Sequence, residues 1–430
     1  MSGPSTTTAP ASGWVRGLCW AAVALEGYDL VVLGVVIPVL RRDPVFALDP
    51  GSATTVATVG LLGVMVGALA VGPVSDVVGR RRTILACVLA FSVLGAACAL
   101  ASGPASLGVL RFVAGVPLGG VVPVALAMVA EHSPGRRGNS SMTTLMTGYH
   151  VGAVAASLLG ALFVVSLGWQ FLFVAGALPA LALLPVLAAK LPRDTPPVVR
   201  DRTTHDGAAR DGAAGGTRAR VNPVRELFRA GFAGPTIAFW VASFMGLLLV
   251  YGLNTWLPEI MRLAGYQLTQ ALYQLLALNV GAVIGLLIGG RVADRIGVRP
   301  ATITWFVTAA VFLALLAVRL PGATVYVAIL LAGIFVFSSQ VLVYAWVGRI
   351  YPAAMRATAL GSASGVGRLG AITGPAVTGA LVAGGLAYPW GFFVFALVAA
   401  LGAVAVATVT RTRRADDLAE AAPEPDRAAT

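Results

Sequence analysis

Long apolar stretches, separated by short polar segments, follow one another along almost the whole chain. Each stretch can cross a bilayer, because a helix of about 20 residues at a rise of 1.5 Å per residue matches a hydrocarbon core of about 30 Å. We therefore predict an all-α integral membrane protein with 12 transmembrane helices. The predicted spans are residues 15–40, 53–75, 82–101, 105–131, 141–166, 169–190, 233–260, 268–294, 300–319, 323–350, 356–383 and 387–410.

A polar segment between the sixth and seventh spans divides the predicted helices into two bundles of six. Its Gly/Ala runs and mixed charges are typical of a flexible linker, and both chain ends have the composition of disordered tails. The expected parts are an N-terminal tail (1–13), an N-terminal six-helix bundle (14–190), a cytoplasmic linker (191–232), a C-terminal six-helix bundle (233–410) and a cytoplasmic tail (411–430).

One polar phrase occurs once in each half of the chain. The sequence GPVSDVVGRR begins at Gly72, and the sequence GRVADRIGVR begins at Gly290. Both contain G-x-x-x-D-x-x-G-x-R between two apolar stretches. A motif that recurs after half the length of the chain indicates a duplicated membrane unit, which is how many secondary transporters are built.

Composition supports a membrane protein and excludes a basic nucleic-acid binder. Hydrophobic residues make up 58% of the chain and charged residues 11%, against roughly 25% charged in a soluble domain. The net charge of +12 comes from arginines spread over many short loops rather than gathered on one face. Most of these flank one side of the spans, so the positive-inside rule places both termini and the linker in the cytoplasm. We expect a multi-pass protein of the cytoplasmic (inner) membrane.

Few ionisable side chains lie inside the predicted spans, and each is a functional candidate because charge in hydrocarbon is costly. Asp29, with Glu26 one turn before it, can bind and release a proton, and Arg111 can tune that carboxylate. Arg368 keeps its charge and offers a planar fork to a substrate carboxylate. A titratable acid and a permanent cation at mid-depth favour proton-coupled uptake of an organic anion.

Structural explanations remain open for the same side chains. Asp29 and Arg111 could neutralise each other as a fixed ion pair, and Arg368 could hold backbone carbonyls in a glycine-rich span. Glu26 could take part in proton binding or only face an inner cavity. His150 could be a hydrogen-bonded packing residue or a proton relay.

Aromatic side chains within the spans suit a cavity for a flat aromatic ligand, because ring stacking adds to burial. We expect Tyr28, Tyr251 and Tyr344, together with His150, to line a substrate site beside Arg368. Other aromatic residues at span ends are typical of the belt at a membrane surface.

No pattern in the sequence indicates an enzyme. The chain lacks a phosphate-binding G-x-x-x-x-G-K-[ST] motif and any Ser/His/Asp or dinucleotide constellation. Cys19, Cys87 and Cys98 lie within spans and have neither disulfide nor metal-site spacing. We predict no catalytic residue, no metal and no cofactor, with the proton gradient as the driving force.

Longer motifs carry a family resemblance. The doubled phrase, RFVAGVPLGG from Arg111 and EHSPGRR from Glu131 resemble the major facilitator superfamily. EGYDLVVLG from Glu26, NTWLP from Asn254 and the stretch 351–375 resemble its aromatic acid:proton symporters. The resemblance implies two six-helix bundles around a central cavity, alternating access, and benzoate, hydroxybenzoate or a similar acid as a substrate that enters with protons.

The doubled phrase also predicts a cytoplasmic gate. Asp76 and Asp294 lie near arginines at the cytoplasmic ends of two spans, where ion pairs can hold the halves together and then release them. We expect Asp76, which faces residues 80–82, to form a stronger latch than Asp294, which faces Arg295 and Arg299. The predicted gating residues are Gly72, Asp76, Gly79, Arg80, Glu131, Arg137, Gly290, Asp294 and Arg299.

Two positions depart from the family pattern. Glu26 stands where the first motif usually has aspartate, and Gln170 stands where an arginine usually follows Gly-Trp. We predict a monomeric importer of a small aromatic anion with protons, embedded in the lipid bilayer. The alternatives are a proton-coupled antiporter that exports a drug-like solute, and a transport-dead receptor for aromatic acids.

Overall fold

The computed structural model describes residues 11–44, 46, 48–132, 137–192, 227–228 and 231–409. The predicted tails and the predicted linker lie almost wholly outside this part of the chain. Eleven of the described helices are long and apolar enough to cross a membrane. They are α1 (Ala11–Leu40), α2 (Pro50–Val78), α3 (Arg80–Cys98), α4 (Pro104–His132), α5 (Arg137–Lys190), α8 (Ala233–Leu263), α9 (Leu268–Ile296), α10 (Val298–Leu315), α11 (Thr324–Ile350), α12 (Ala353–Ala383) and α13 (Trp390–Ala407).

One long helix accounts for two of the predicted spans. α5 has 54 residues and contains both 141–166 and 169–190. Between them Gly168 leaves the helical conformation, with φ 80° and ψ 168°. Only glycine adopts this backbone conformation without strain. The helix therefore breaks at Gly168, and its two parts correspond to the fifth and sixth predicted spans.

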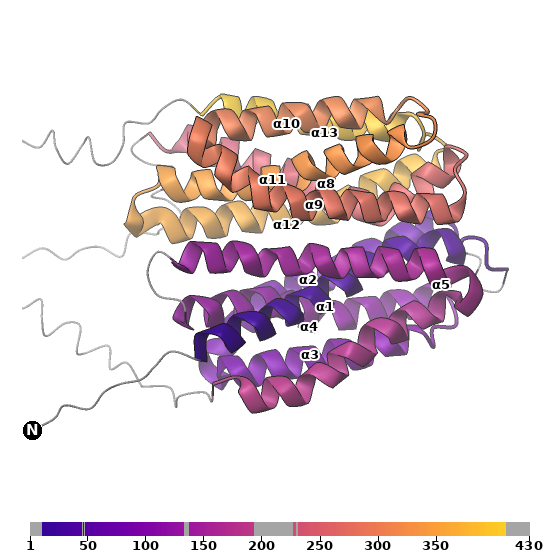
Figure 1. The fold of residues 1–430 in the computed structure, drawn as a ribbon, viewed down its shortest axis with the longest axis horizontal. Helices are drawn as coiled ribbons and strands as arrows, with labels where there is room; N and C mark the ends of the chain where they lie inside the picture. Colours follow the sequence, from indigo (N-terminus) through magenta and orange to yellow (C-terminus); the bar gives the residue numbers. More distant parts are fainter. Residues whose placement is uncertain are drawn as a thin grey trace, which may run out of the picture.

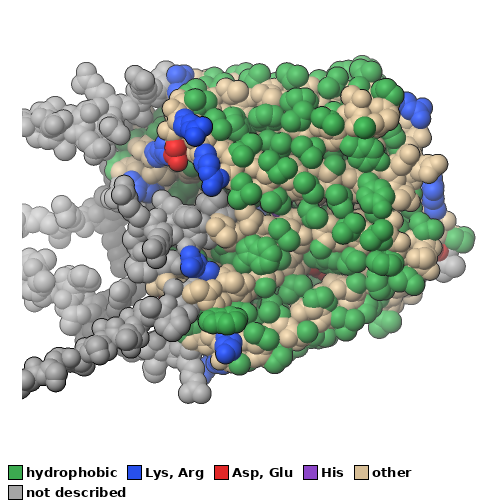
Figure 2. All heavy atoms as spheres, viewed as in Figure 1, with side chains coloured by type: hydrophobic (Ala, Val, Ile, Leu, Met, Phe, Trp, Pro, Cys, Tyr) green, Lys and Arg blue, Asp and Glu red, His purple; other side chains and the backbone are tan. Residues whose placement is uncertain are grey.

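The helices form two bundles that correspond to the two halves of the sequence. In Figure 1, α1 to α5 lie together below the group of α8 to α13. α1 begins and α13 ends on the left of Figure 1, which we call the termini end. The opposite end, where α1 ends and α2 begins, is called the far end. Figure 2 shows a broad hydrophobic surface between the two ends, with basic side chains gathered at the termini end, as in a protein that spans a bilayer.

Glycines bring helices of the same bundle into close contact, and they do so at matching places in the two halves. A Cβ atom added to Gly63 of α2 would lie 2.2 Å from a backbone oxygen of α4. A Cβ atom added to Gly281 of α9 would likewise lie 2.2 Å from a backbone oxygen of α11. Small residues at such crossings drive helix association in membranes, where the hydrophobic effect between helices is absent. The second and fourth spans of each half therefore pack in the same way, as a duplication predicts.

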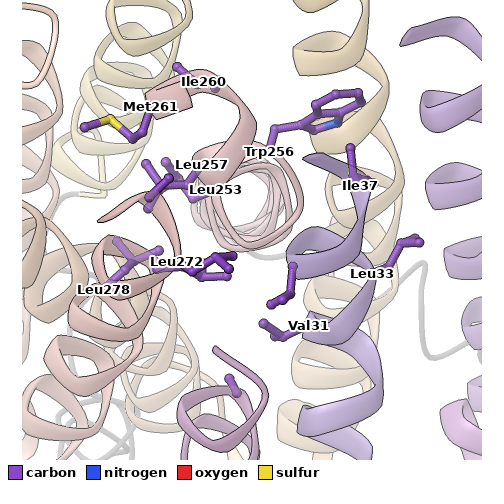
Figure 3. Close-up of a cluster of buried hydrophobic side chains, with 14 of the residues drawn as sticks. Val31, Leu33, Ile37, Leu253, Trp256, Leu257, Ile260, Met261, Leu272 and Leu278 are labelled. Atoms are coloured by element: carbon purple, nitrogen blue, oxygen red, sulfur yellow. The ribbon is translucent and has the colours of Figure 1, made fainter. Parts of the chain in front are cut away.

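The two bundles meet along three helix pairs, α1 with α8, α2 with α12 and α5 with α9. Figure 3 shows Ile37 of α1 with Leu253 and Trp256 of α8 in one buried apolar cluster. A Cβ atom added to Gly34 of α1 would lie 2.1 Å from the carbonyl oxygen of Asn254 in α8. These residues lie toward the far end of their helices, so the bundles are tightly packed there.

Candidate functional site

Asp29 and Arg111 form a buried ion pair within the N-terminal bundle. Arg111 Nη1 of α4 donates to Asp29 Oδ2 of α1 at 2.7 Å, and Nη2 donates to the Asp29 backbone oxygen at 3.0 Å. The two residues are 3% and 8% exposed. Gly60 of α2 and Gly95 of α3 leave room for the pair, because added Cβ atoms would lie 3.4 Å from the Arg111 Cβ and 3.2 Å from Asp29 Oδ1. The structure thus joins the two residues that the sequence left as either a proton site or a fixed pair.

Glu26, one turn before Asp29 on α1, faces the other bundle. It is 2% exposed, and its Oε2 atom has no hydrogen-bond partner among the described residues. The charges that act on it are Arg368 of α12 and Asp29. A buried carboxyl group without a hydrogen-bond partner is costly in its charged form. The charges near Glu26 therefore decide whether its ionised form is stable.

Arg368 of α12 lies within electrostatic range of side chains from both bundles. Its guanidinium interacts electrostatically with Glu26 of α1 and with Tyr149 of α5, Tyr251 of α8 and Tyr344 of α11. The Tyr251 hydroxyl lies within hydrogen-bonding reach of this guanidinium. The side chain is half-buried. Arg368 is therefore a permanent cation at the interface of the two bundles.

A narrow cavity lies between the bundles beside the Asp29–Arg111 pair. It is lined by Arg111, Tyr149, Tyr251, Asn254 and Thr255, with apolar residues of α1 and α2. Its volume of about 10 Å³ is that of a single water-sized molecule. A substrate of the size of a benzene ring therefore enters only if the bundles or their side chains move.

His150 lies at the same interface, among aromatic and amide side chains. Its ring is 5.0 Å from that of Tyr149 and 4.8 Å from that of Phe337 in α11, both edge to face. The amide of Asn279 in α9 is next to the imidazole, and Asn279 Nδ2 donates to Asn254 Oδ1 at 2.9 Å. Asn254 begins the motif NTWLP, for which the sequence predicted no role in the site, and Asn279 was not among the predicted site residues.

Tyr28 lies apart from these groups. Its hydroxyl donates to the Leu172 carbonyl at 2.8 Å, and its ring packs on Gly176 in the second part of α5. Tyr251 and Tyr344, by contrast, lie beside Arg368. The structure therefore gathers His150, Tyr251, Tyr344 and Arg368, and places Tyr28 against its own bundle.

The predicted gate residues form ion pairs within their own bundles. Arg80 lies 3.3 Å from Asp76 and 2.9 Å from Glu131. Asp294 pairs with Arg349 of α11 at 2.7 Å. The prediction that Asp294 faces Arg295 and Arg299 is therefore wrong, because its ion-pair partner comes from a neighbouring helix.

The remaining gate residues are placed as follows. Arg299 donates instead to the Ala407 carbonyl at 3.1 Å. Gly79 and Gly297, with φ of 106° and 94°, end α2 and α9 in a conformation that favours glycine. Cβ atoms added to Gly72 and Gly290 would meet nothing within 4 Å. The Arg137 side chain lies outside the described residues.

A second buried ion cluster lies at the far end. Glu259 of α8 is fully buried, and Arg262 donates to it from Nε at 2.8 Å and from Nη2 at 2.6 Å. Arg41, just after α1, donates to the same carboxylate from the other bundle. Among the described residues this is the one ion pair that joins the two bundles.

Comparisons with known proteins give the chain a family. A family model described as Major Facilitator Superfamily matches residues 19–287 and 276–429. The chain is 32% identical over 413 residues to the Benzoate transport protein of Acinetobacter baylyi, covering 91% of this chain and 88% of that protein. It is 35% identical over 398 residues to the Gentisate transporter of Corynebacterium glutamicum, covering 92% and 87%.

The fold has counterparts among solved structures. A D-xylose-proton symporter matches with a TM-score of 0.76 at 16% identity, covering 93% of this chain and 98% of that chain. At this identity the likeness concerns the fold alone, and it agrees with the all-helical architecture in two halves. The chain therefore belongs to the Major Facilitator Superfamily, as the doubled motif predicted, and its relatives there are transporters of aromatic acids.

Proposed function

We propose that this protein is a proton-coupled secondary transporter that carries an aromatic carboxylate into the cytoplasm by alternating access. It works as a monomer in the inner membrane, with both termini cytoplasmic, and uses the proton gradient instead of a cofactor. The names of its relatives support the substrate class. The observation that carries the proposal is the electrostatic interaction between Glu26 of one bundle and Arg368 of the other, with three tyrosines within range of Arg368.

Arg368 is the substrate-binding cation in this proposal. Its planar guanidinium can pair with a carboxylate through two parallel hydrogen bonds. Tyr149, Tyr251 and Tyr344 surround it, and their rings can pack against an aromatic ring. An aromatic acid matches both features at once, whereas a sugar or an aliphatic cation lacks the carboxylate that would pair with Arg368.

Proton coupling follows from competition for this one cation. Glu26 and a bound substrate carboxylate would both face Arg368, and one guanidinium cannot compensate two buried negative charges. Glu26 therefore takes up a proton when the substrate binds. The sequence favoured Asp29 as the main proton carrier, but Arg111 already pairs with Asp29. The geometry supports Glu26 as the titrating group and the Asp29–Arg111 pair as its fixed neighbour.

The test is uptake of labelled benzoate by proteoliposomes under an inward proton gradient. We expect accumulation above equilibrium, which Glu26→Gln abolishes while exchange of internal for external benzoate continues, because exchange needs no net proton movement. Asp29→Asn is the matched variant, and loss of coupling there with full coupling in Glu26→Gln would return the proton role to Asp29. Proton-driven loss of benzoate from the vesicles would indicate an exporter. Binding without flux would indicate a receptor.

The same assay tests Arg368. Arg368→Lys keeps the charge but loses the fork, so we expect benzoate affinity to fall roughly 10- to 150-fold, equivalent to about 1.5–3 kcal/mol. Benzamide, which has no charge for the arginine to meet, should bind weakly to both proteins. Equal losses for both ligands would show that Arg368 is structural.

A further inference from the structure

The buried polar side chains beside His150 have more hydrogen-bonding capacity than the protein uses. Within the described part of the chain, His150 Nδ1, Asn254 Nδ2 and Asn279 Oδ1 have no hydrogen-bond partner. The three residues are 8%, 3% and 0% exposed. Buried polar groups are otherwise almost always paired, so this set, which we call the amide–imidazole cluster, has capacity for an external partner.

The cluster is one connected group at the interface of the two bundles. Asn279 bonds Asn254 and lies next to His150, so α5, α8 and α9 each supply one member. Asn254 also lines the narrow cavity, together with Tyr149 and Tyr251. The unpaired atoms include an amide donor, an amide acceptor and a ring nitrogen, which together suit a hydroxyl group because it both donates and accepts.

α11 connects this cluster with Arg368. Phe337 contacts His150, and Tyr344 lies beside Arg368, on the same helix. The two are seven residues apart, or about 10 Å along the helix axis, and on nearly the same face. Gln340, between them, has an amide that is unpaired among the described residues and lies against Gly246 of α8. The path from Arg368 to the cluster is therefore bordered by aromatic rings and has a polar group at each end.

We propose that the amide–imidazole cluster binds a ring hydroxyl on the side of the substrate opposite its carboxylate, so that the transporter prefers 4-hydroxylated aromatic acids to benzoate. The inference rests on the proposed function, in which Arg368 holds the carboxylate. Arg368 is half-buried and the cluster is buried, so the hydroxyl would occupy the more enclosed end of the site. Benzoate or an alkyl-substituted ring would leave the cluster unpaired, which sites of this kind reject.

A ligand series on the parent protein tests the proposal without any variant. Direct binding is measured for 4-hydroxybenzoate, 2-hydroxybenzoate, benzoate and 4-methylbenzoate, the last of which fills the same space without a hydrogen-bonding group. We expect 4-hydroxybenzoate to bind at least about 10-fold more tightly than 4-methylbenzoate, and 2-hydroxybenzoate to bind like benzoate. Equal affinity for all four would overturn the subsite and leave the transport function intact. Absence of binding for all four would overturn the function itself.

Asn279→Leu then locates the subsite, with Gln274→Leu as the matched control. Gln274 is an equally buried amide on α9 with no partner among the described residues. Gln274 lies seven residues before Gly281, so it is on nearly the same face of α9, the face that packs on α11. It is about 140° around the helix from Asn279 and therefore points away from the cluster. Asn279→Leu should reduce the preference for the hydroxyl to within about 3-fold while 4-methylbenzoate affinity is kept. Gln274→Leu should keep the preference.

His150 gives a second, independent position for the same experiment. His150→Phe should also remove the preference, and His150→Gln, which keeps a donor and an acceptor, should restore most of it. Each variant is compared at equal membrane abundance. If the variant at Asn279 or at His150 fails to insert into the membrane, the variant at the other residue still tests the proposal. A full preference in both Asn279→Leu and His150→Phe would show that the hydroxyl is bound elsewhere.

Discussion

The two ends of the molecule hold their charged residues in different ways. At the far end, the fully buried Glu259 accepts hydrogen bonds from Arg41 of one bundle and from Arg262 of the other. At the termini end, Asp76 and Asp294 form ion pairs inside their own bundles and have side chains that are 66% and 69% exposed. Similar chemistry thus joins the two bundles at the far end, whereas these two ion pairs at the termini end stay within their own bundles.

The two ends differ in how strongly their ion pairs stabilise this conformation, because the pair at the far end is buried and the pairs at the termini end are exposed. Removing one partner of a buried ion pair costs about 3–5 kcal/mol, whereas an exposed pair contributes about 0–1 kcal/mol. We infer that the conformation with the far end closed depends on Glu259. The acids of the doubled motif then contribute mainly in the opposite conformation, when the termini end closes.

Glu259→Gln should have the largest effect, because the amide leaves two guanidiniums near a buried site without a negative charge. We expect the far end to open at a cost to the closed conformation of about 3–5 kcal/mol. The reporter is disulfide formation between Thr54→Cys and Gly379→Cys in a protein without Cys19, Cys87 and Cys98. A Cβ atom added to Gly379 of α12 lies 2.8 Å from the Cβ atom of Thr54 in α2, about 1 Å closer than in a disulfide, so the cross-link needs the helices to shift by about that much and the parent double-cysteine protein is the reference for every yield. The yield of this cross-link should fall strongly.

Arg262→Gln is the control for that result. Arg262 binds the same carboxylate from its own helix, at a spacing of three residues, so its loss leaves the bond between the bundles in place. The cross-link yield should fall much less than in Glu259→Gln or Arg41→Gln. Equal losses in all three would mean that the carboxylate merely stabilises α8 and does not join the bundles.

A pair of glycines tests whether packing follows the same pattern as charge. In Gly34→Ala the new Cβ would lie 2.1 Å from the Asn254 carbonyl oxygen and 3.1 Å from the Thr255 Cα, backbone atoms that cannot turn aside. Overpacking of this kind costs about 1–3 kcal/mol, so the far end should open and the cross-link yield should fall. Gly72→Ala, which meets nothing within 4 Å, should leave the yield unchanged. A drop in Gly72→Ala alone would reverse the assignment of the closed end.

The apolar pattern predicted the helices well because crossing a bilayer requires long apolar segments whatever the tertiary contacts. The division of α5 was also predictable, since Gly168 lies in the gap between two apolar stretches. Contacts between distant helices were less so. The partner of Asp294 is Arg349, 55 residues later on α11, and local sequence favoured the nearer Arg295 and Arg299.

The site was predicted in part for a related reason. Embedded charges are rare and costly, so Glu26, Asp29, Arg111 and Arg368 could be identified from the sequence. Their pairing could not, because it depends on which helix faces meet. Asn254 was identified only as part of a family motif and Asn279 was missed, because the role of an amide in an apolar span depends on its neighbours.

Replacing the latch acids, Asp76 and Asp294, should have a smaller effect than the far-end variants, and it should change the rate of uptake rather than the cross-link yield. Asp76→Asn and Asp294→Asn remove exposed pairs, so neither should change the far-end cross-link yield. Both should slow uptake, because the termini end closes less readily. With Arg349 at 2.7 Å from Asp294, the expected ranking of the two latches loses its basis, and we expect losses of similar size at equal membrane abundance. A change in cross-link yield in either variant would mean that the two ends are coupled already in this conformation.

The smallest effect should come from Asp49, an exposed acid at the far end that touches only its own helix. Asp49 Oδ1 accepts hydrogen bonds from the backbone amides of Ser52 at 3.1 Å and Gly51 at 2.8 Å, and so caps α2. Hydrogen bonds, chiefly from Ser52, lower the pKa of Asp49 below its ordinary 3.8. A lowered folded-state pKa means that the cap stabilises the protein above that ordinary value and is lost as pH falls through the folded-state pKa.

Asp49→Ala should therefore lower the melting temperature slightly at neutral pH, and the difference from the parent should shrink in acid below pH 3.8. Asp49→Asn keeps an uncharged cap, so its melting temperature should depend less on pH in this range. Neither variant should change the yield of the Thr54→Cys/Gly379→Cys cross-link, because the cap does not reach the other bundle. If Asp49→Ala reduced that yield as much as Glu259→Gln, the far end would be held closed by the start of α2, and the buried ion cluster would lose its role.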